Sequence, residues 1–337
     1  VTVVQPPGSG FLTLYPGNAT RPLVANTNYI LTDILNNVFT VGLDPVNGTF
    51  KVYTSQTAEV VIDITGYYAP PGPGGLYFHP LPHPARLLET RIGQPGCTNP
   101  GAPLGALSTT TQQGTTTCDG VTIPAAAKAL VGNATTVNPQ ANGFLTLYPA
   151  DAASAPLAAS GNYKLGQTLN SPFTVGLSPT GQFKIYTVAQ TDLVVDVLGY
   201  FSADATDANG TGLLFNPLTP SRLLDTRVGA TGACFLPGAP LTALTEVSQT
   251  ARNVCTIANT AQAIVGNVTT VLPPANGFLT LWPSDAASRP LASTSNYPSG
   301  RNFNRYFTVG LGADGKFKMY PSQTIDLVID VSGYFAP

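Results

Sequence analysis

The stretch GFLTLYP occupies residues 10–16 and again residues 143–149, and it returns as GFLTLWP at residues 277–283. In each copy a Gly-Tyr pair that closes a valine-rich run follows 56 residues after the first glycine, at Gly66, Gly199 and Gly333. The same spacing three times identifies the chain as an array of related repeats. Every other motif is therefore judged by whether it recurs.

The repeats begin 133 and 134 residues apart. This spacing predicts complete modules at residues 77–201 and 213–337, which we name the second and third repeats. Residues 1–69, the first copy, hold only the back part of a module, because the counterpart of residues 77–133 is not among them. Residues 70–76, rich in Pro and Gly, predict a stiff linker, and residues 202–212 a more pliable one.

Charged residues make up only 9% of the chain, and the net charge is −2. This composition excludes a basic surface for nucleic acid or an anionic membrane. No run of 18 apolar residues that would insert into a bilayer is present. The 43% of hydrophobic residues suffices for packed cores. A surface with so few charges tolerates permanent contact with neighbours, which favours a protein packed against copies of itself. A compact secreted domain with an uncharged polar surface is the alternative.

The four cysteines lie in the two complete repeats, where Cys97 and Cys118, and Cys234 and Cys255, are each 21 residues apart. This recurrence predicts one disulfide in each repeat, which in the chain-entropy model stabilises by about 3 kcal/mol. Disulfides indicate an oxidising, extracellular compartment. Two thiols without a repeated histidine do not complete a tetrahedral zinc site, so we expect no metal.

Short apolar runs separated by Gly, Pro and Asn turns predict an all-β fold of tandem β-sandwich or jelly-roll-like modules. Phe39, Phe173 and Phe307 each begin an FTVGL strand, and an FK(V/I/M)Y strand follows each one. The Asn-Gly, Thr-Gly and Asp-Gly turns between them predict an antiparallel hairpin. The valine-rich runs that end in Gly-Tyr predict central strands buried on both faces.

The recurring ionisable residues are Arg86, Glu89 and Arg91, their counterparts Arg222, Asp225 and Arg227, and Asp63, Asp196 and Asp330 in the closing strands. An aspartate between valines in a buried strand needs a partner, and a guanidinium matches a carboxylate. We expect structural ion pairs of Asp196 with Arg86 or Arg91, and of Asp330 with Arg222 or Arg227. Ligand contact and a hydrolase carboxylate pair are the alternatives.

His79 and His83 have no counterparts in the third repeat. They are expected in an exposed loop at a module junction. No nucleophile elbow, phosphate-binding loop or zinc-protease motif is present. The sequence therefore predicts no catalytic residue, no metal and no cofactor.

Aromatic residues recur at Tyr15, Tyr148 and Trp282. Core packing and stacking on sugar rings are both open for them. Among the Asn-x-Ser/Thr sequons, those at Asn18, Asn47 and Asn209 are candidate glycosylation sites. The sequons at Asn133 and Asn267 lie next to a predicted paired strand and are poorer acceptors.

The RLLETR and RLLDTR starts, the central GFLTLYP strand and the closing DVLGYF and DVSGYF strands resemble the repeat domains of secreted or cell-surface proteins of actinobacteria and Chloroflexi-type bacteria. The resemblance covers almost the whole chain. It implies an extracellular module, and the family supplies no activity.

These features favour a non-enzymatic structural protein of an extracellular fibre, sheath or surface coat. The alternative is an extracellular carbohydrate-binding or adhesive array, with surface polysaccharide as its partner. The first copy lacks the strands that its siblings use to complete their sheets, and Asp63 lacks their arginines. We therefore expect sequence from outside residues 1–337 to complete it, either a neighbouring subunit arranged head to tail or a segment upstream of Val1. The alternative is that residues 1–69 form a small domain that is stable alone. Asp63 and Tyr67 are the candidate contact residues.

Overall fold

The computed structural model describes all 337 residues, Val1–Pro337. It is built from β-strands and contains no helix, which confirms the predicted all-β class. No helix is therefore present that is long and apolar enough to cross a membrane. The chain forms two compact units. Unit 1 comprises Val1–Ile62, Phe215–Ala287 and Thr294–Ala336, and unit 2 comprises Asp63–Leu214, Ser288–Ser293 and Pro337.

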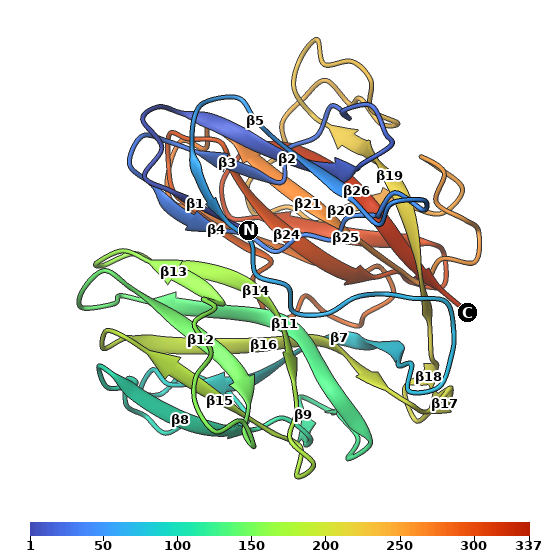
Figure 1. The fold of residues 1–337 in the computed structure, drawn as a ribbon. Coiled ribbons are helices and arrows are strands. Elements are labelled where there is room, and N and C mark those ends of the chain that lie inside the picture. Colours follow the sequence, from blue (N-terminus) through green and yellow to red (C-terminus); the bar gives the residue numbers. More distant parts are fainter. The chain divides into compact units, whose positions relative to one another are not determined.

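The second repeat is a sandwich of two four-stranded sheets, with the strand orders β14-β11-β16-β7 and β13-β12-β15-β8. All these pairings are antiparallel. Figure 1 shows these strands in the teal-to-yellow part of the chain. The strands are β7 (Tyr77–Glu89), β8 (Ser108–Gln113), β9 (Thr117–Cys118), β10 (Val121–Thr122), β11 (Ala127–Val137), β12 (Gly143–Pro149), β13 (Gly161–Tyr163), β14 (Leu169–Gly176), β15 (Gln182–Thr187) and β16 (Asp192–Ser202).

The core of the second repeat lies between its two sheets. In β12, Leu145 and Leu147 face inward and meet Leu130 of β11 and Val195 of β16 in one buried cluster. Side chains of successive strand residues point to opposite faces, so each sheet contributes one apolar face. β16 is buried along almost its whole length, which confirms the central strand that its valine-rich sequence predicts.

The third repeat has the same two-sheet topology within unit 1, with the orders β19-β26-β21-β24 and β20-β25-β22-β23. Its strands are β19 (Leu214–Asp225), β20 (Val247–Thr250), β21 (Ala263–Val271), β22 (Gly277–Pro283), β23 (Ser295–Tyr297), β24 (Phe303–Gly310), β25 (Lys316–Pro321) and β26 (Asp326–Ala336).

The first copy also belongs to unit 1, and its two sheets have only three strands each, in the orders β4-β1-β6 and β3-β2-β5. Val3, Leu12, Leu14 and Tyr29 form its small core. Its strands are β1 (Thr2–Val4), β2 (Gly10–Pro16), β3 (Thr27–Tyr29), β4 (Ile34–Asn36), β5 (Phe50–Thr54) and β6 (Glu59–Val61).

The hairpin predicted between the FTVGL and FK(V/I/M)Y strands is wrong. In the second repeat β14 pairs with β11, whereas β15 pairs with β12 and β8. The intervening turn, closed by a 2.8 Å bond from the Gly181 amide to the Ser178 carbonyl, crosses from one sheet to the other. Phe173 and Phe183 thereby enter the same core from different sheets.

The closing strand predicted for the first copy is also largely absent. β6 ends at Val61, and residues 62–68 have no regular structure. In the complete repeats this strand pairs on one side with β7 or β19. The first copy has no such neighbour, so the backbone groups beyond Val61 have no ladder to join.

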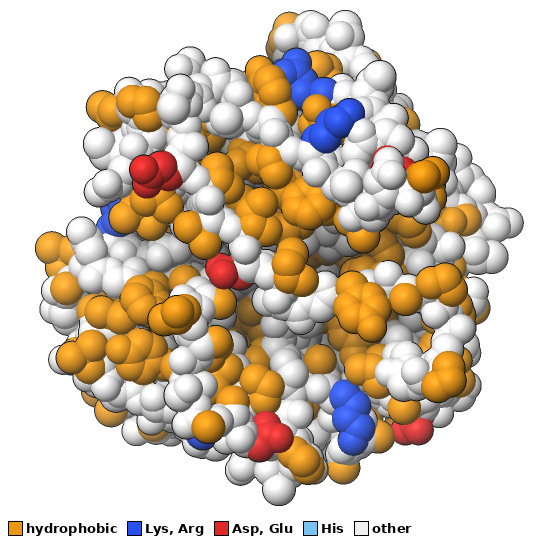
Figure 2. All heavy atoms as spheres, in the orientation of Figure 1, with side chains coloured by type: hydrophobic (Ala, Val, Ile, Leu, Met, Phe, Trp, Pro, Cys, Tyr) orange, Lys and Arg blue, Asp and Glu red, His pale blue; other side chains and the backbone are white.

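The segment 202–212 is more ordered than a pliable linker. It forms a short antiparallel hairpin from β17 (Thr206–Asp207) and β18 (Gly210–Thr211). Residues 70–76 form exposed bends. Figure 2 shows how few Lys, Arg, Asp and Glu side chains lie on the visible face, as the 9% charged composition predicts.

Candidate functional site

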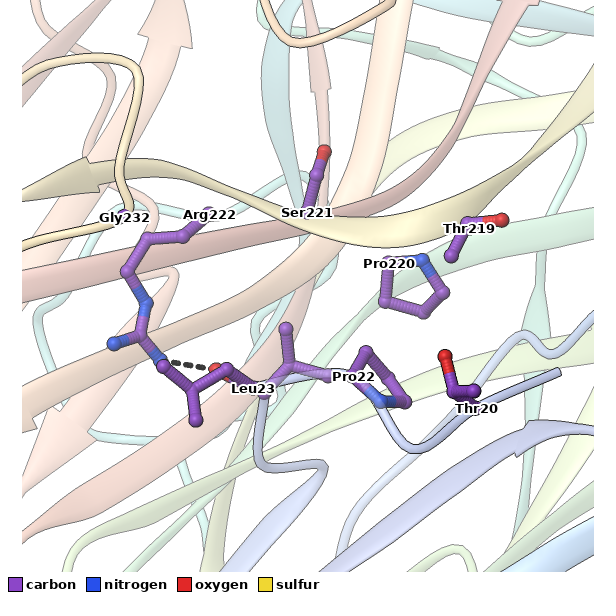
Figure 3. A pocket seen from close by; sticks show the side chains of 9 residues that line it. Thr20, Pro22, Leu23, Thr219, Pro220, Ser221, Arg222 and Gly232 are labelled. Carbon is purple, nitrogen blue, oxygen red and sulfur yellow. Dashed lines mark hydrogen bonds between the residues drawn. The ribbon is translucent and has the colours of Figure 1, made fainter.

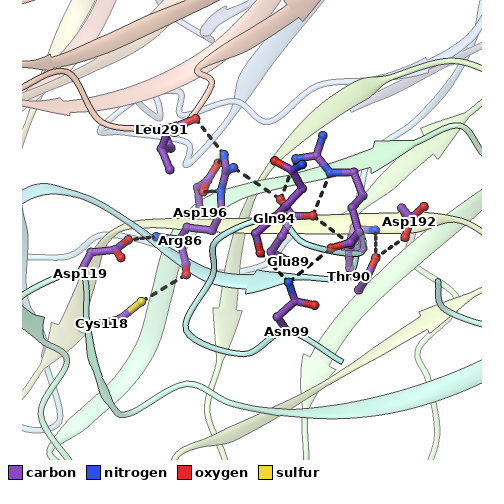
Figure 4. A network of polar contacts seen from close by, with 12 residues as sticks. Arg86, Glu89, Thr90, Gln94, Asn99, Cys118, Asp119, Asp192, Asp196 and Leu291 are labelled. Atoms are coloured by element: carbon purple, nitrogen blue, oxygen red, sulfur yellow. Dashed lines mark hydrogen bonds and ion pairs between the residues drawn. The ribbon is translucent and has the colours of Figure 1, made fainter. Parts of the chain in front are cut away.

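A network of arginines and carboxylates lies at the start of the second repeat, where β7 borders β16 (Figure 4). Arg86 Nε donates to Asp196 Oδ1 at 2.9 Å, and its Nη1 lies 3.5 Å from Glu89 Oε2. Glu89 also binds Arg91, with 2.6 Å between Arg91 Nη2 and Glu89 Oε2. Arg86 therefore pairs with two carboxylates, Asp196 and Glu89, and Arg91 binds Glu89 as well.

The third repeat contains the same network. Arg222 Nε donates to Asp330 Oδ1 at 2.9 Å, and its Nη1 lies 3.4 Å from Asp225 Oδ2. Arg227 Nη2 binds Asp225 Oδ2 at 2.6 Å. Asp196 and Asp330 thus lie beside Arg86 and Arg222, one of the two partners expected for each, while Arg91 and Arg227 bind Glu89 and Asp225 instead.

The two kinds of carboxylate differ in their electrostatics. Burial raises the pKa of Asp330 to about 6, against the opposing hydrogen bond and charge of Arg222. Burial likewise raises the pKa of Asp196. For Glu89, burial acts to raise the pKa, but the bonds and charge of Arg91 outweigh it and lower the pKa. Each carboxylate therefore binds a guanidinium, as expected of structural ion pairs.

Both disulfides are present, joining Cys97 to Cys118 and Cys234 to Cys255, which is the pairing that their spacing predicts. Each bridge lies against the strand that carries the network arginine. The Cys97 amide donates to the Arg86 carbonyl at 3.1 Å, and the Cys234 amide to the Arg222 carbonyl at 3.0 Å. The disulfide loop therefore holds the backbone of the arginine in place.

Arg86 and Arg222 each also donate a hydrogen bond to a backbone carbonyl that is not part of the ion pairs. Arg222 Nη2 donates to the Leu23 carbonyl at 2.8 Å, within unit 1. Arg86 Nη2 donates to the Leu291 carbonyl at 2.8 Å, within unit 2. Figure 3 shows the first of these bonds at the rim of a cavity of about 290 Å³. The cavity is lined on one side by Thr20, Pro22, Leu23 and Val24, and on the other by residues 219–222.

The first copy packs against the third repeat inside unit 1 through asparagines that the sequence analysis did not identify as packing contacts. Asn37 Nδ2 donates to Asn267 Oδ1 at 2.9 Å, and Asn37 Oδ1 accepts from the Tyr306 amide at 2.9 Å. Arg301 Nη2 binds Asp33 Oδ2 at 2.6 Å. The sequence indicates this packing only through the pair Asn36-Asn37 next to an apolar strand, because buried asparagines need hydrogen-bond partners.

The candidate contact residues of the first copy lie in its irregular closing segment. Asp63 is partly exposed and Tyr67 is 88% exposed. Tyr200, the counterpart of Tyr67, is fully buried. The structure therefore does not give Asp63 the arginine that Asp196 and Asp330 bind, and it leaves Tyr67 without the burial of Tyr200.

The aromatic residues considered for glycan stacking do not form a sugar-binding surface. Trp282 is 0% exposed and Tyr148 is 5% exposed. Tyr15 is half-buried, with the Lys51 amine 5.9 Å from its ring centroid. The stacking interpretation is wrong for Trp282 and Tyr148, because a buried ring offers no face to a sugar.

The candidate sequons divide by exposure. Asn18 and Asn47 lie exposed in turns. Asn209 instead donates through Nδ2 to the Thr122 carbonyl at 2.7 Å and to Tyr200 Oη at 2.9 Å. Because its amide nitrogen holds the β17–β18 hairpin, Asn209 is a structural residue and a poor glycan acceptor.

His79 is not in an exposed loop, which corrects the expectation from sequence. It lies in β7 and is fully buried, with its ring stacked on Tyr200 at a centroid distance of 5.1 Å. Its Nε2 lies 2.9 Å from the Asp204 carbonyl oxygen. Asp207 Oδ1 also lies 3.4 Å from His79 Nδ1. Both contacts come from a segment far away in the sequence, so no local signal marks His79 as buried.

No protein-family model and no curated protein matches this sequence. Among solved structures, the STIV MCP is 7% identical, with a TM-score of 0.22 over 78% of this chain and 98% of that chain. The N-terminal CBM22-1-CBM22-2 tandem domain of Paenibacillus barcinonensis Xyn10C is 9% identical, with a TM-score of 0.17 over 74% and 97%. Likeness this weak carries no functional argument.

Proposed function

We propose that this chain is a non-enzymatic structural protein of an extracellular fibre, sheath or surface coat, and that copies assemble head to tail by completing the sandwich of the first copy. The conserved plan of the repeats supports this proposal. Each complete sandwich has four strands per sheet, and the first copy has three. The missing neighbours are the counterparts of β7 and β8, which border the closing strand and β15.

The exposure of core positions is the observation that carries the proposal. Ile64 is 68% exposed, whereas its counterparts Val197 and Val331 are fully buried. Val52 is 43% exposed, whereas its counterpart Ile185 is fully buried. Apolar side chains and unpaired strand edges in water favour association with a further strand.

The chemistry of the partner follows from the complete repeats. The strand that covers the closing strand there carries Arg-Leu-Leu, and its arginine binds the buried aspartate of the closing strand. A neighbouring subunit that supplies such a strand would cover Ile64 and give Asp63 its arginine. Strand addition of this kind is an established mode of protein association.

A role without catalysis is supported by the ion-pair networks, in which arginines bind four of the five repeated carboxylates, all except Asp63. An extracellular location is supported by the two disulfides. The sparsely charged surface suits permanent contact. The burial of Trp282 and Tyr148 removes the main support for the carbohydrate-binding alternative.

The test uses the full chain at increasing concentration, with sedimentation and negative-stain electron microscopy. We expect polymers from the unchanged protein and their loss in Ile64→Lys. Ile64 is exposed in the single chain but would be buried under the added strand, and burial of a lysine charge is unfavourable. The matched control is Ile92→Lys, at an isoleucine that is 82% exposed in a complete repeat, and it should assemble normally. A chain that stays monomeric at all concentrations, or an Ile64→Lys variant that still polymerises, contradicts the proposal.

A further inference from the structure

Arg305 is a buried arginine that uses only part of its hydrogen-bonding capacity. It lies in β24 and is 0% exposed. Its Nη1 donates to the Asn36 carbonyl at 3.2 Å, but no protein acceptor lies within hydrogen-bond distance of its Nε or Nη2. Such burial is unfavourable, because it removes the water that would otherwise bind these N–H groups. The two donors therefore need an acceptor that the chain itself does not supply.

Arg305 also lacks a counter-charge of its own. Asp33 acts on it electrostatically, but the Asp33 carboxylate binds Arg301, with 2.6 Å between Arg301 Nη2 and Asp33 Oδ2. The ring centroid of Phe303 lies 4.2 Å from Arg305 Cζ and 5.7 Å from Arg301 Cζ. An aromatic face attracts a cation but has no lone pair for the N–H groups. Burial and the charge of Arg301 lower the pKa of Arg305 to about 9, so Arg305 remains charged at neutral pH.

Two other buried donors in this part of the third repeat have no protein partner, Arg301 Nε and Ser295 Oγ. Ser295 in β23 and Arg305 in β24 occupy the positions that Gly161 and Ser171 have in the second repeat. There, a Cβ atom at residue 161 would meet the Ser171 hydroxyl. The side chains of Ser295 and Arg305 therefore start side by side, and the second repeat has no charge at either position.

We infer that the third repeat binds one small monovalent anion, chloride, between Arg305 and Ser295. The Nε and Nη2 groups of Arg305 and the Ser295 hydroxyl donate to the anion, whose charge neutralises the guanidinium. Arg305 and Ser295 are both 0% exposed, and an enclosed site of this kind favours a single halide ion over phosphate or a sugar acid. A water molecule would accept the same hydrogen bonds but would leave the buried charge uncompensated. This inference does not depend on the proposed assembly.

The first test follows urea unfolding of the full chain by the fluorescence of Trp282, the single tryptophan, which is buried in the third repeat. Sodium chloride is compared with sodium gluconate at equal ionic strength, because gluconate is too large for the site. A ligand that binds only the folded state stabilises it. The folding equilibrium constant should therefore rise about tenfold for each tenfold rise in chloride above its dissociation constant, and bromide should act like chloride.

Arg305→Met keeps a long unbranched side chain but removes the charge, so its urea midpoint should be the same in chloride and gluconate. The matched control is Arg21→Met, at an exposed arginine of the same unit, and it should keep the difference between the two salts. Equal midpoints of the unchanged protein in chloride and gluconate overturn the inference. A folded Arg305→Met variant that still responds to chloride overturns it as well.

The second test locates the anion in the unchanged protein and serves if Arg305→Met does not fold. Crystals grown in sodium bromide should show an anomalous-scattering peak in contact with Arg305 Nε, Arg305 Nη2 and Ser295 Oγ. A water molecule at this position in the bromide crystals contradicts the inference. Bromide peaks that lie only at the protein surface show an adventitious ion only, and they contradict it too.

Discussion

At the scale of single residues, the chain uses one arginine for three tasks. Arg86 binds the buried Asp196, pairs with the second carboxylate Glu89, and donates to the Leu291 carbonyl. Arg222 does the same in the third repeat. A lysine has no planar fork and would not satisfy these directions at once. The buried aspartate thus orients the arginine whose Nη2 donates to the loop carbonyl.

We predict that Asp330→Ala lowers the stability of unit 1. It removes the carboxylate bound by the Nε of Arg222, and breaking a buried pair costs about 3–5 kcal/mol because a charge is left unpaired. Thermal or denaturant unfolding measures the loss. Asp63→Ala is the control. Asp63 is the counterpart of Asp330 in the first copy and is partly exposed, so this substitution should change the stability little. Equal stability of the two variants would contradict a structural role for the pair.

The pKa of Asp330 predicts a component of stability that increases as pH falls. Burial raises this pKa to about 6 from an ordinary 3.8. Between these values the folded protein holds a proton that the unfolded chain releases, so this group stabilises the fold as pH decreases from about 6 to 4, by a few kcal/mol at most.

Asp330→Asn isolates this component, because the amide keeps the shape but does not titrate. Urea unfolding of both proteins from pH 7 to pH 4 gives the difference in unfolding free energy. We expect that difference to shift in favour of the unchanged protein as pH falls. The lowered pKa of Asp225 acts in both proteins and cancels. A difference that is independent of pH would show that Asp330 is not shifted upward.

At the scale of elements, the sequence predicts strand existence well and strand pairing poorly. The short apolar runs correctly predict an all-β fold, and the valine-rich run correctly predicts a buried β16. The Thr180-Gly181 turn misleads, because positive φ at Gly181 serves a crossing between sheets as well as a hairpin. Local turn chemistry does not specify which sheet receives the next strand.

The candidate site likewise combines contacts that the sequence predicts with contacts that it does not predict. The ion pairs of Asp196 and Asp330 follow from a buried carboxylate and a repeated arginine. The Leu23 and Leu291 contacts do not, because their acceptors are backbone carbonyls, which every residue has. The burial of Trp282 was left open by the sequence for a related reason. A ring on the outer face of one strand is covered only by what other segments bring to it.

At the scale of the whole molecule, sequence adjacency does not decide which repeats form a unit. The first copy joins the third repeat in unit 1, although the second repeat lies between them in the chain. The contacts are hydrogen-bonded and buried, with Asn37 bridging Asn267 and the Tyr306 amide. The three-stranded sheets of the first copy thereby gain support on one side, while their open edges remain.

We therefore predict that Asn37→Ala loosens the first copy and leaves unit 2 intact. The substitution leaves Asn267 Oδ1 and the Tyr306 amide without this partner in a buried setting, and each such loss costs about 1–3 kcal/mol. Hydrogen exchange followed by mass spectrometry should show faster exchange in residues 1–62 and unchanged exchange in residues 77–201. Asn18→Ala, at an exposed asparagine of the same copy, is the control.

A second effect, on hydrogen exchange near Arg222, makes the prediction for Asn37→Ala more specific. If the first copy is held by the third repeat, loosening it also withdraws the Leu23 carbonyl from Arg222, so peptides that contain Arg222 should exchange faster although Asn37 does not contact them. Protection that is unchanged in residues 1–62 would show that the first copy is stable alone. It would then need neither the third repeat nor a neighbouring strand, and the case for assembly through its open edges would lose its physical basis.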